Sequence, residues 1–238
     1  MCETGVTPSA RGAGYASGML PSPKYTALTD TLYEYMAAHR SPDDAVVQEL
    51  RDETAALGSS SVMQVAPDQA TFLRILVAAI GARRAIEVGT FTGYSALAIA
   101  RGLPPDGRLL CMDVSEEWTS IARRYWEKAG VSDRIELRLG PAAETLRSLP
   151  EEPVYDFGFV DADKKGYPVY WEEIVRRLRP GGLIGIDNVL WEGDVVLPKK
   201  RGEDIEAIRS FNELVLTDDR VESVMLSVAD GLTLARKL

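Results

Sequence analysis

The sequence predicts an α/β protein with a doubly wound, mostly parallel β-sheet. Through the centre of the chain, short apolar runs typical of buried strands alternate with helical patterns. This alternation indicates right-handed crossovers and helices on both faces of a parallel sheet. Near the C-terminus, two β-rich runs flank Ala229-Asp230-Gly231, and an Asp-Gly pair is a strong hairpin signal. The sheet is therefore expected to end in antiparallel strands.

The N-terminal part of the chain predicts a leader followed by helices. Residues 1–18 are small, polar and glycine-rich without periodicity, so they bury too little apolar area to offset the entropy of ordering. Apolar residues recur at helical spacing over 25–39, and a second helical pattern runs over 43–57 after Ser41-Pro42. A length of 238 residues suits one α/β domain. The predicted organisation is a disordered leader over 1–23 and a single domain over 24–238, with N-terminal helices over 24–60 and a core over 61–238.

The elements of the core are predicted from their residue patterns. Apolar runs of strand length bounded by turn residues predict strands over 85–88, 109–114, 135–140, 157–162 and 183–188. Helical patterns lie between and after them, over 93–102, 116–129, 141–149, 167–178 and about 203–215.

Charge and composition exclude several classes of partner. A net charge of −9 and a pI near 4.8 argue against nucleic acid, whose binding depends on clustered Lys and Arg. No apolar stretch approaches the roughly 20 residues of a membrane span. Cys2 and Cys111 do not form a disulfide framework. We therefore expect a cytoplasmic protein that acts on a small molecule and contacts neither membrane nor nucleic acid.

A glycine-containing loop between the first core strand and its helix predicts a cofactor site. The segment reads Glu87-Val-Gly89-Thr-Phe-Thr-Gly93-Tyr-Ser95, and glycines there let the backbone turn tightly beside a ligand. Its spacing lacks the G-x-G-x-x-G pyrophosphate fingerprint of a dehydrogenase. Asp113 closes the next strand, where a carboxylate can accept hydrogen bonds from both ribose hydroxyls, and Glu87 could bind a cationic amine. Taken alone, the glycine loop could be a plain turn and Asp113 could be a helix cap. Taken together, the loop and the acidic residues favour an adenosine ligand without phosphates.

Two polar clusters predict a metal site. Asp161-Ala-Asp163-Lys164 and Asp187-Asn188 each follow an apolar strand, so both emerge at the carboxyl edge of the sheet, where neighbouring strands lie about 4.8 Å apart. Carboxylate and amide oxygens from Asp161, Asp187 and Asn188 suit a hard cation such as Mg²⁺, which leaves positions open for a vicinal diol.

The same cluster contains a candidate base. A phenol with a pKa near 10 is a poor nucleophile at neutral pH, and a metal ion makes its ionised form accessible. Lys164 lies three residues after Asp161. Beside a dication an ammonium group is disfavoured, so a neutral Lys164 amine could take the hydroxyl proton, with Asp161 and Lys164 as the catalytic pair.

The residue types of these clusters also occur in other kinds of structure. Strand-end acids commonly cap the next helix, and Asp-Asn commonly forms a turn. Residues 161–172 mimic a calcium loop, but Lys165 and the preceding strand argue against it. His39 is the only histidine and lies in the early helical region, which leaves a Ser-His-Asp triad almost without support. A nucleotide-dependent oxidoreductase and a cofactor-binding scaffold without catalysis are the remaining alternatives.

At these residues the chain resembles the cation-dependent O-methyltransferases of the caffeoyl-CoA and catechol O-methyltransferase group. The resemblance spans about 24–238 and is carried by EVGTFTGYS, FVDADK, GGLIGIDNVLWEG and DGLTLARKL, in family order. It implies a Rossmann-like, seven-stranded class I methyltransferase fold, S-adenosylmethionine as cofactor, and Mg²⁺ or another divalent cation such as Mn²⁺ or Ca²⁺. The function it implies is methyl transfer to one hydroxyl of a catechol-type substrate.

The resemblance also implies roles for individual residues. Positions that contact S-adenosylmethionine match Val65, Glu87, Gly89, Thr90, Ser95, Asp113, Ala142 and Asp163. Metal ligands match Asp161, Asp187 and Asn188, and Lys164 matches the proposed base of the catechol enzymes. Trp191 resembles an aromatic wall for a planar ring, and Arg209 resembles a position associated with acyl-CoA recognition. The resemblance further implies a homodimer.

Overall fold

A computed structural model of the chain describes residues 26–238. The chain divides into two compact units, Met1–Ala38 and His39–Leu238. The leader predicted over 1–23 lies outside the described residues. What is described of the first unit contains helix α1 (Asp30–Ala38), which has no buried residue. The first predicted helix therefore forms, over a shorter range than its pattern indicated.

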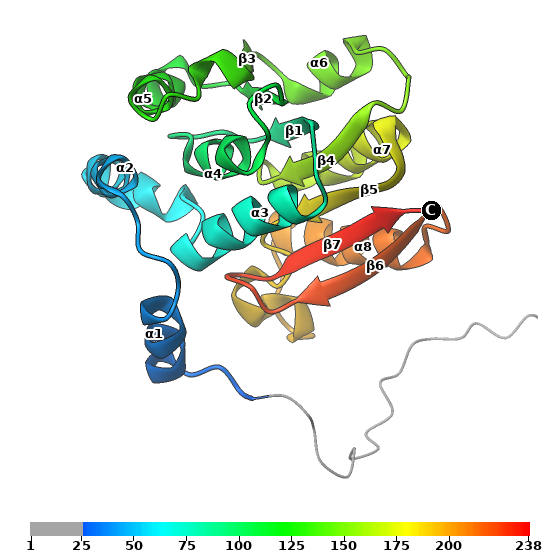
Figure 1. Ribbon diagram of the computed structural model, residues 1–238. Coiled ribbons are helices and arrows are strands. Elements are labelled where there is room, and N and C mark those ends of the chain that lie inside the picture. The colour runs from blue at the N-terminus through cyan, green and yellow to red at the C-terminus, as the bar shows by residue number, and fades with distance from the viewer. Residues whose placement is uncertain (1–25) are drawn as a thin grey trace, which may run out of the picture. The chain divides into compact units, whose positions relative to one another are not determined.

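In the second unit, seven strands of the described chain form one sheet in the order β3-β2-β1-β4-β5-β7-β6 (Figure 1). Strands β1 to β5 pair in parallel, and β7 runs antiparallel to both β5 and β6. Their bounds are β1 (Arg84–Val88), β2 (Arg108–Asp113), β3 (Ile135–Leu139), β4 (Tyr155–Val160), β5 (Leu178–Ile186), β6 (Val221–Leu226) and β7 (Leu232–Lys237). The prediction of a mostly parallel sheet with an antiparallel C-terminal hairpin is confirmed.

Each face of the sheet packs against its own set of helices. On one face lie α2 (Ala45–Ala55), α3 (Pro67–Ala79), α4 (Tyr94–Gly102) and α5 (Glu116–Lys128). On the other lie α6 (Ala142–Ser148), α7 (Tyr167–Arg177) and α8 (Glu203–Thr217), and α8 is seen behind the β6–β7 hairpin in Figure 1. Strand residues contribute to a hydrophobic core on each face: Phe157 packs in the core with α2 to α5, and Ile184 packs in the core with α6 to α8. The three layers confirm the doubly wound arrangement.

Local sequence signals explain where several helices begin. The Asp44 carboxylate accepts a hydrogen bond from the backbone N–H of Val47 at 3.0 Å and caps α2. Ser115 caps α5 in the same way. Proline stands at the first position of α3, where its missing N–H costs nothing. Short 3₁₀ segments connect the main elements: η1 (Gly58–Met63), η2 (Ser132–Arg134), η3 (Lys164–Gly166) and η4 (Trp191–Val196).

Helix α3 was not predicted from the sequence. Its residues Ala70, Leu73 and Val77 are buried against the sheet, but Ile75 on the same helix is exposed, so its pattern is less regular than that of an isolated amphipathic helix.

No helix of the described chain has both the length and the apolar character needed to cross a membrane.

Candidate active site

The carboxyl ends of β1, β4 and β5 meet in register. Val160 of β4 pairs with Val88 of β1 on one side and with Ile186 of β5 on the other. The ladder continues one residue beyond each strand: Asp161 donates its N–H to the Val88 carbonyl at 2.9 Å, and Asp187 donates to the Val160 carbonyl at 3.0 Å. The two predicted metal clusters are therefore neighbours at this edge.

Lys164 of the first cluster is buried and reaches the second cluster. Its ammonium group donates hydrogen bonds to Asn188 Oδ1 at 2.7 Å, to the Tyr167 hydroxyl at 2.7 Å and to Asp161 Oδ1 at 3.2 Å. Tyr167 in turn donates to the backbone carbonyl of Asp187 at 3.0 Å. The candidate base therefore contacts two of the three candidate metal ligands directly.

The carboxyl groups of Asp161 and Asp187 are both shifted in pKa by their surroundings. Burial, followed by the charge of Asp161, raises the pKa of Asp187 above its ordinary value. Burial also raises the pKa of Asp161, although Lys164 acts in the opposite direction. The Oδ1 atom of Asp187 is buried without a hydrogen-bond partner. The ammonium group of Lys164 thus does not balance the negative charge of both carboxylates.

These residues fit a divalent cation. Two carboxylates and an amide carbonyl are the oxygen donors that Mg²⁺ prefers, and the unpartnered Asp187 oxygen is a free donor for it. Among the described residues no group of three or more His, Cys, Asp or Glu side chains is placed to hold a metal ion. A cation bound between the two carboxylates would therefore need the amide of Asn188 as its third protein ligand.

The backbone around Asn188 is held in an uncommon conformation. Asn188 has φ 56°, and Trp191 and Glu192 have φ 48° and 52°, values that cost non-glycine residues energy and cluster at functional sites. Asp230 from the hairpin stabilises this segment: its carboxylate accepts from the Glu192 N–H at 2.6 Å and from Asn188 Nδ2 at 3.4 Å. The Asp-Gly turn thus also orients a candidate ligand.

The glycine loop packs directly on the metal cluster. Gly89 has φ +86°, and a Cβ atom there would lie 1.8 Å from the Asp161 carbonyl oxygen. Only glycine lets the loop approach β4 this closely. The loop and Asp161 therefore occupy fixed positions relative to each other.

We expect Gly89→Ala to destabilise the protein by about 3 kcal/mol, because it adds a steric clash to the strain of a left-handed backbone. Gly58→Ala is the matched control, since Gly58 also has positive φ (+66°) but nothing lies within 4 Å of the added Cβ; it should cost only about 1 kcal/mol. Urea unfolding followed by circular dichroism measures both. Equal losses for the two variants would contradict the close approach at Gly89.

Asp113 at the end of β2 organises the same loop. Its Oδ2 accepts the backbone N–H groups of Thr90 and Phe91 at 2.9 and 2.8 Å, and its Oδ1 accepts that of Ser115 at 2.8 Å. A carboxylate has about four acceptor positions, so these bonds leave capacity for a ribose hydroxyl. Asp113 therefore both shapes the loop and remains a predicted cofactor contact.

The other predicted cofactor residues lie around this loop. Glu87 is fully buried below it, and burial raises its pKa to about 8, although the neighbouring Ser95 in the first turn of α4 acts against this shift. Gln64 Nε2 donates to Thr92 at 3.4 Å and so brings the neighbouring Val65 close to the loop. Gly140 donates to the Asp113 carbonyl at 2.9 Å, just before Ala142 begins α6. Except for Asp163, which follows β4, the predicted residues lie around the carboxyl ends of β1, β2 and β3. A cationic ligand group would suit the unpaired oxygen of Glu87.

Asp163 is exposed and has local partners. Its side chain accepts from the Gly166 N–H at 2.9 Å and from the Tyr170 hydroxyl at 2.5 Å. This is the helix-capping role that a strand-end acid often has. Its contact with the cofactor stays a prediction.

The two predicted substrate residues differ in their surroundings. Trp191 lies at the metal cluster, with Lys164 Nζ 5.7 Å from its ring centroid. All five N–H donors of Arg209 are used within its own neighbourhood. They bind the carbonyls of Asp194, Val195, Leu197 and Lys200 and the Glu206 carboxylate. Arg209 therefore stabilises segment 194–200. Direct contact between Arg209 and a substrate stays a prediction.

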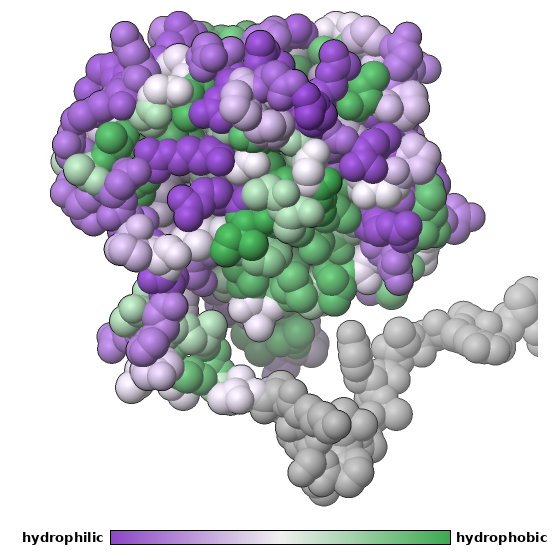
Figure 2. Space-filling view, in the orientation of Figure 1, coloured by the Kyte–Doolittle hydropathy of each residue, from purple (hydrophilic) through white to green (hydrophobic). Residues whose placement is uncertain are grey.

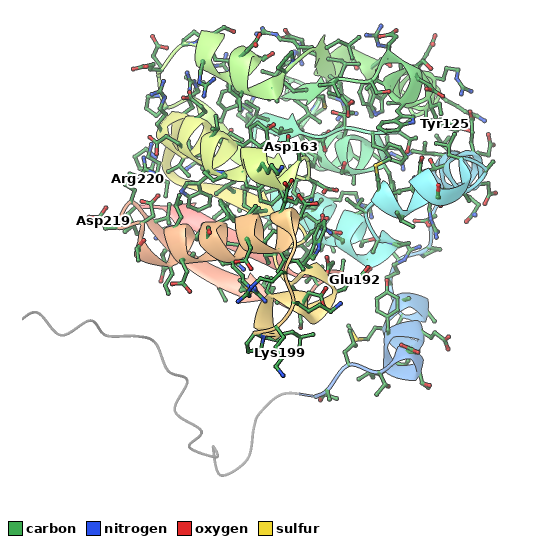
Figure 3. All side chains as sticks on the ribbon, turned by 180° about the vertical axis from the view of Figure 1, so that it is seen from behind. Tyr125, Asp163, Glu192, Lys199, Asp219 and Arg220 are labelled. Atoms are coloured by element: carbon green, nitrogen blue, oxygen red, sulfur yellow. The ribbon has the colours of Figure 1, made fainter. Side chains whose placement is uncertain are left out.

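Figure 3 shows this segment from the other side of the molecule. Glu192 and Lys199 both come from the stretch that precedes α8, and Lys199 points out of the domain, away from Asp163. Lys199 and the two basic residues that follow it are exposed, and Lys200 and Arg201 pair with Asp194 and Glu206.

Three residues of the site were not singled out from the sequence. Tyr167 could have been found, since it lies three residues after Lys164. Asp230 was interpreted only as a turn residue. Gln69 of α3 is fully buried, its amide faces Asp187 and lowers the pKa of that carboxyl, yet neither of its polar atoms has a hydrogen-bond partner. No sequence signal indicated it, because α3 itself was not predicted.

Comparison with known proteins identifies relatives along almost the whole described chain. The model of a family described as O-methyltransferase matches residues 37–238. A probable caffeoyl-CoA O-methyltransferase 1 of Dictyostelium discoideum is 38% identical over 213 residues, which cover 88% of this chain and 93% of the relative. The catechol O-methyltransferase domain-containing protein 1 of Mus musculus is 35% identical over 245 residues, covering 97% and 93%.

Solved structures show the same architecture. An O-methyltransferase from Bacillus cereus in complex with SAH superposes with a TM-score of 0.80 at 35% identity, covering 87% of this chain and 97% of that one. The O-methyltransferase TomG from Streptomyces achromogenes, in complex with SAM, has a TM-score of 0.78 at 28% identity, covering 87% and 96%. Fold, site and relatives agree: the chain belongs to the caffeoyl-CoA and catechol O-methyltransferase-like family and is an S-adenosylmethionine-dependent O-methyltransferase.

Proposed function

We propose that this enzyme transfers the methyl group of S-adenosylmethionine to one hydroxyl of a vicinal-diol, catechol-type aromatic substrate, with a divalent cation held by Asp161, Asp187 and Asn188. The observation that carries this proposal is the unpartnered, buried Asp187 oxygen in a cluster of two carboxylates and one amide, directly beside the cofactor loop. The names of the relatives, caffeoyl-CoA and catechol O-methyltransferases, support a substrate of this class.

In the transfer itself, a bond forms between the substrate oxygen and the methyl carbon while the carbon–sulfur bond breaks. The sulfur leaves as a neutral thioether. A bound Mg²⁺ would hold both oxygens of the diol and lower the pKa of the reacting hydroxyl. The hydroxyl proton passes to Lys164 Nζ, which must be a neutral amine at that moment.

The neighbours of Lys164 suit this task. Tyr167 holds Lys164 Nζ at 2.7 Å and is anchored to the Asp187 carbonyl, so the amine stays within reach of a group bound between Asp161 and Asn188. Close positioning of this kind contributes much of the rate acceleration of enzymes. We propose that Trp191 provides one wall for the aromatic ring and that Arg209 acts on substrate choice through segment 194–200.

A substrate panel tests the proposal. Catechols, flavonoids, hydroxycinnamoyl thioesters and polyketide-like diols are incubated with S-adenosylmethionine and Mg²⁺, and methylated products are measured by mass spectrometry. We expect vicinal diols to be methylated and their mono-hydroxyl analogues not to be. EDTA should abolish turnover, and excess Mg²⁺ should restore it. Equal turnover of monophenols in EDTA would exclude the proposed function.

We also propose that the enzyme is a homodimer in a reducing, cytoplasmic environment, in which the buried thiol of Cys111 stays free. Apolar surface gathers over the β6–β7 hairpin and the adjoining end of α3 (Figure 2). Ile75 of α3 and Val224 of β6 are 59% and 50% exposed there, and such patches mark interaction surfaces.

We expect Val224→Asp to convert the dimer to a monomer, because a charge would be buried in the interface. Sedimentation velocity measures the change, with Leu216→Asp on α8, exposed by 71%, as control. An unchanged dimer in the Val224 variant would exclude this surface.

A further inference from the structure

Glu87 and Cys111 form a buried pair below the cofactor loop. They lie directly opposite each other in the parallel register of β1 and β2, and both are fully shielded from solvent. The Cys111 thiol donates a hydrogen bond to Glu87 Oε2 at a sulfur–oxygen distance of 3.4 Å. The other carboxyl oxygen, Oε1, has no partner.

The groups around Glu87 do not balance a negative charge. Neutral donors face it: Ser95 from α4, Cys111 from β2 and Thr90 from the loop. The charged group that acts on it is Asp161, which follows β4 and repels the carboxylate. A buried carboxylate without a cationic partner is costly. A cationic ligand group bound to the free oxygen of Glu87 would therefore stabilise the carboxylate.

Cys111 remains a hydrogen-bond donor across the physiological range. Burial, with Glu87 next in order, raises the pKa of its thiol well above the ordinary value, so the sulfur keeps its proton. A protonated thiol that binds Oε2 fixes the plane of the carboxyl group and thereby the direction of Oε1. The thiol also favours the ionised form of Glu87.

We propose that Cys111 is a positioning residue for the cofactor: its thiol holds one oxygen of Glu87 and leaves the other for the ammonium group of the methionine part of S-adenosylmethionine. The proposal rests on the use of this cofactor and is independent of the metal and of the diol substrate. Cys111 acts only through Glu87 and does not itself contact the reacting atoms.

Two substitutions separate this role from simple packing. Cys111→Ser retains a donor of similar size, whereas Cys111→Val removes the donor but retains the apolar volume. Met112→Leu is the control, since Met112 is the next residue of β2 and is fully buried in the core on the other face. Binding of S-adenosylhomocysteine to metal-free protein is measured by isothermal titration calorimetry.

We expect Cys111→Val to weaken S-adenosylhomocysteine binding about fivefold, in the range of one lost hydrogen bond. Cys111→Ser and Met112→Leu should bind as the wild type does. In turnover assays, the KM for S-adenosylmethionine should rise in Cys111→Val while kcat at saturating cofactor stays unchanged. Wild-type affinity in Cys111→Val, or equal weakening in Cys111→Ser, would overturn the proposal.

The pH dependence of binding gives a second measurement. Because a neutral Glu87 cannot pair with an ammonium group, cofactor affinity should rise as the pH passes through the pKa of Glu87, about 8, and level off once Glu87 is fully ionised. In Cys111→Val the midpoint should move to higher pH, since the donor that favours the carboxylate is gone. An unchanged midpoint would overturn the proposal. Because S-adenosylhomocysteine binding needs no substrate, a failure to methylate catechols would not affect this result.

Discussion

Replacing Asp187 with alanine is expected to lower kcat/KM for a catechol substrate by about a thousandfold, which corresponds to roughly 4 kcal/mol of lost transition-state stabilisation. The variant removes a carboxylate that is almost fully buried and has one oxygen without a partner. Mn²⁺ binding, followed by electron paramagnetic resonance, should weaken in parallel. Affinity for S-adenosylhomocysteine should stay close to that of the wild type, because no predicted cofactor contact is removed.

The same substitution should not unfold the protein. The Asp187 backbone carbonyl still accepts the Tyr167 hydroxyl, and the removal of a buried carboxylate that has one oxygen without a partner is expected to cost the metal-free chain little stability. Asp219→Ala is the control, since Asp219 is exposed and lies at the end of α8 beside Arg220, apart from Asp163 (Figure 3). Wild-type turnover of the Asp187 variant would exclude this residue as a metal ligand.

Replacing Lys164 with methionine is expected to lower kcat between about a hundredfold and ten-thousandfold, the usual contribution of a positioned general base. Lys164→Arg should not restore the rate, because a guanidinium group cannot accept a proton. Metal affinity should rise in Lys164→Met, since the ammonium group that contacts Asp161 and Asn188 no longer competes with the cation. Steady-state kinetics and Mn²⁺ titration measure the two effects.

Lys165→Met is the matched control for this experiment. Lys165 is the next residue, but it is exposed and pairs with Glu203 instead of the metal cluster. Its substitution should leave kcat unchanged. A full rate in Lys164→Met, or an equal loss in both variants, would show that Lys164 does not take the proton.

Local patterns were sufficient for most of the fold. The strand runs that end at Val88 and Val160 are mostly apolar because helices cover both faces of their sheet. Helix α3 was not predicted because the exposed apolar side chain of Ile75 interrupts the helical spacing of its buried apolar residues. The strand at Leu178–Ile186 also begins earlier than predicted, since Pro180 and two glycines in it gave no strand signal.

The candidate site, too, was predicted in part from the sequence. Asp161, Asp187 and Asn188 were predicted together because parallel strands bring their carboxyl ends to one edge. That Lys164 bridges Asp161 and Asn188, and that Asp187 retains an unpartnered oxygen, could not be predicted. These facts depend on side-chain positions after packing.

The sequence by itself determined the fold class, the cofactor loop and the family, because periodicity, glycine spacing and motif order are properties of neighbouring residues. Only the tertiary structure decided which donors and acceptors meet. The Cys111 thiol contacts Glu87 because of the strand register, and Arg209 donates four of its hydrogen bonds to carbonyls of segment 194–200. Such pairings join residues separated in sequence, and they are chosen by packing and burial, which no local pattern encodes.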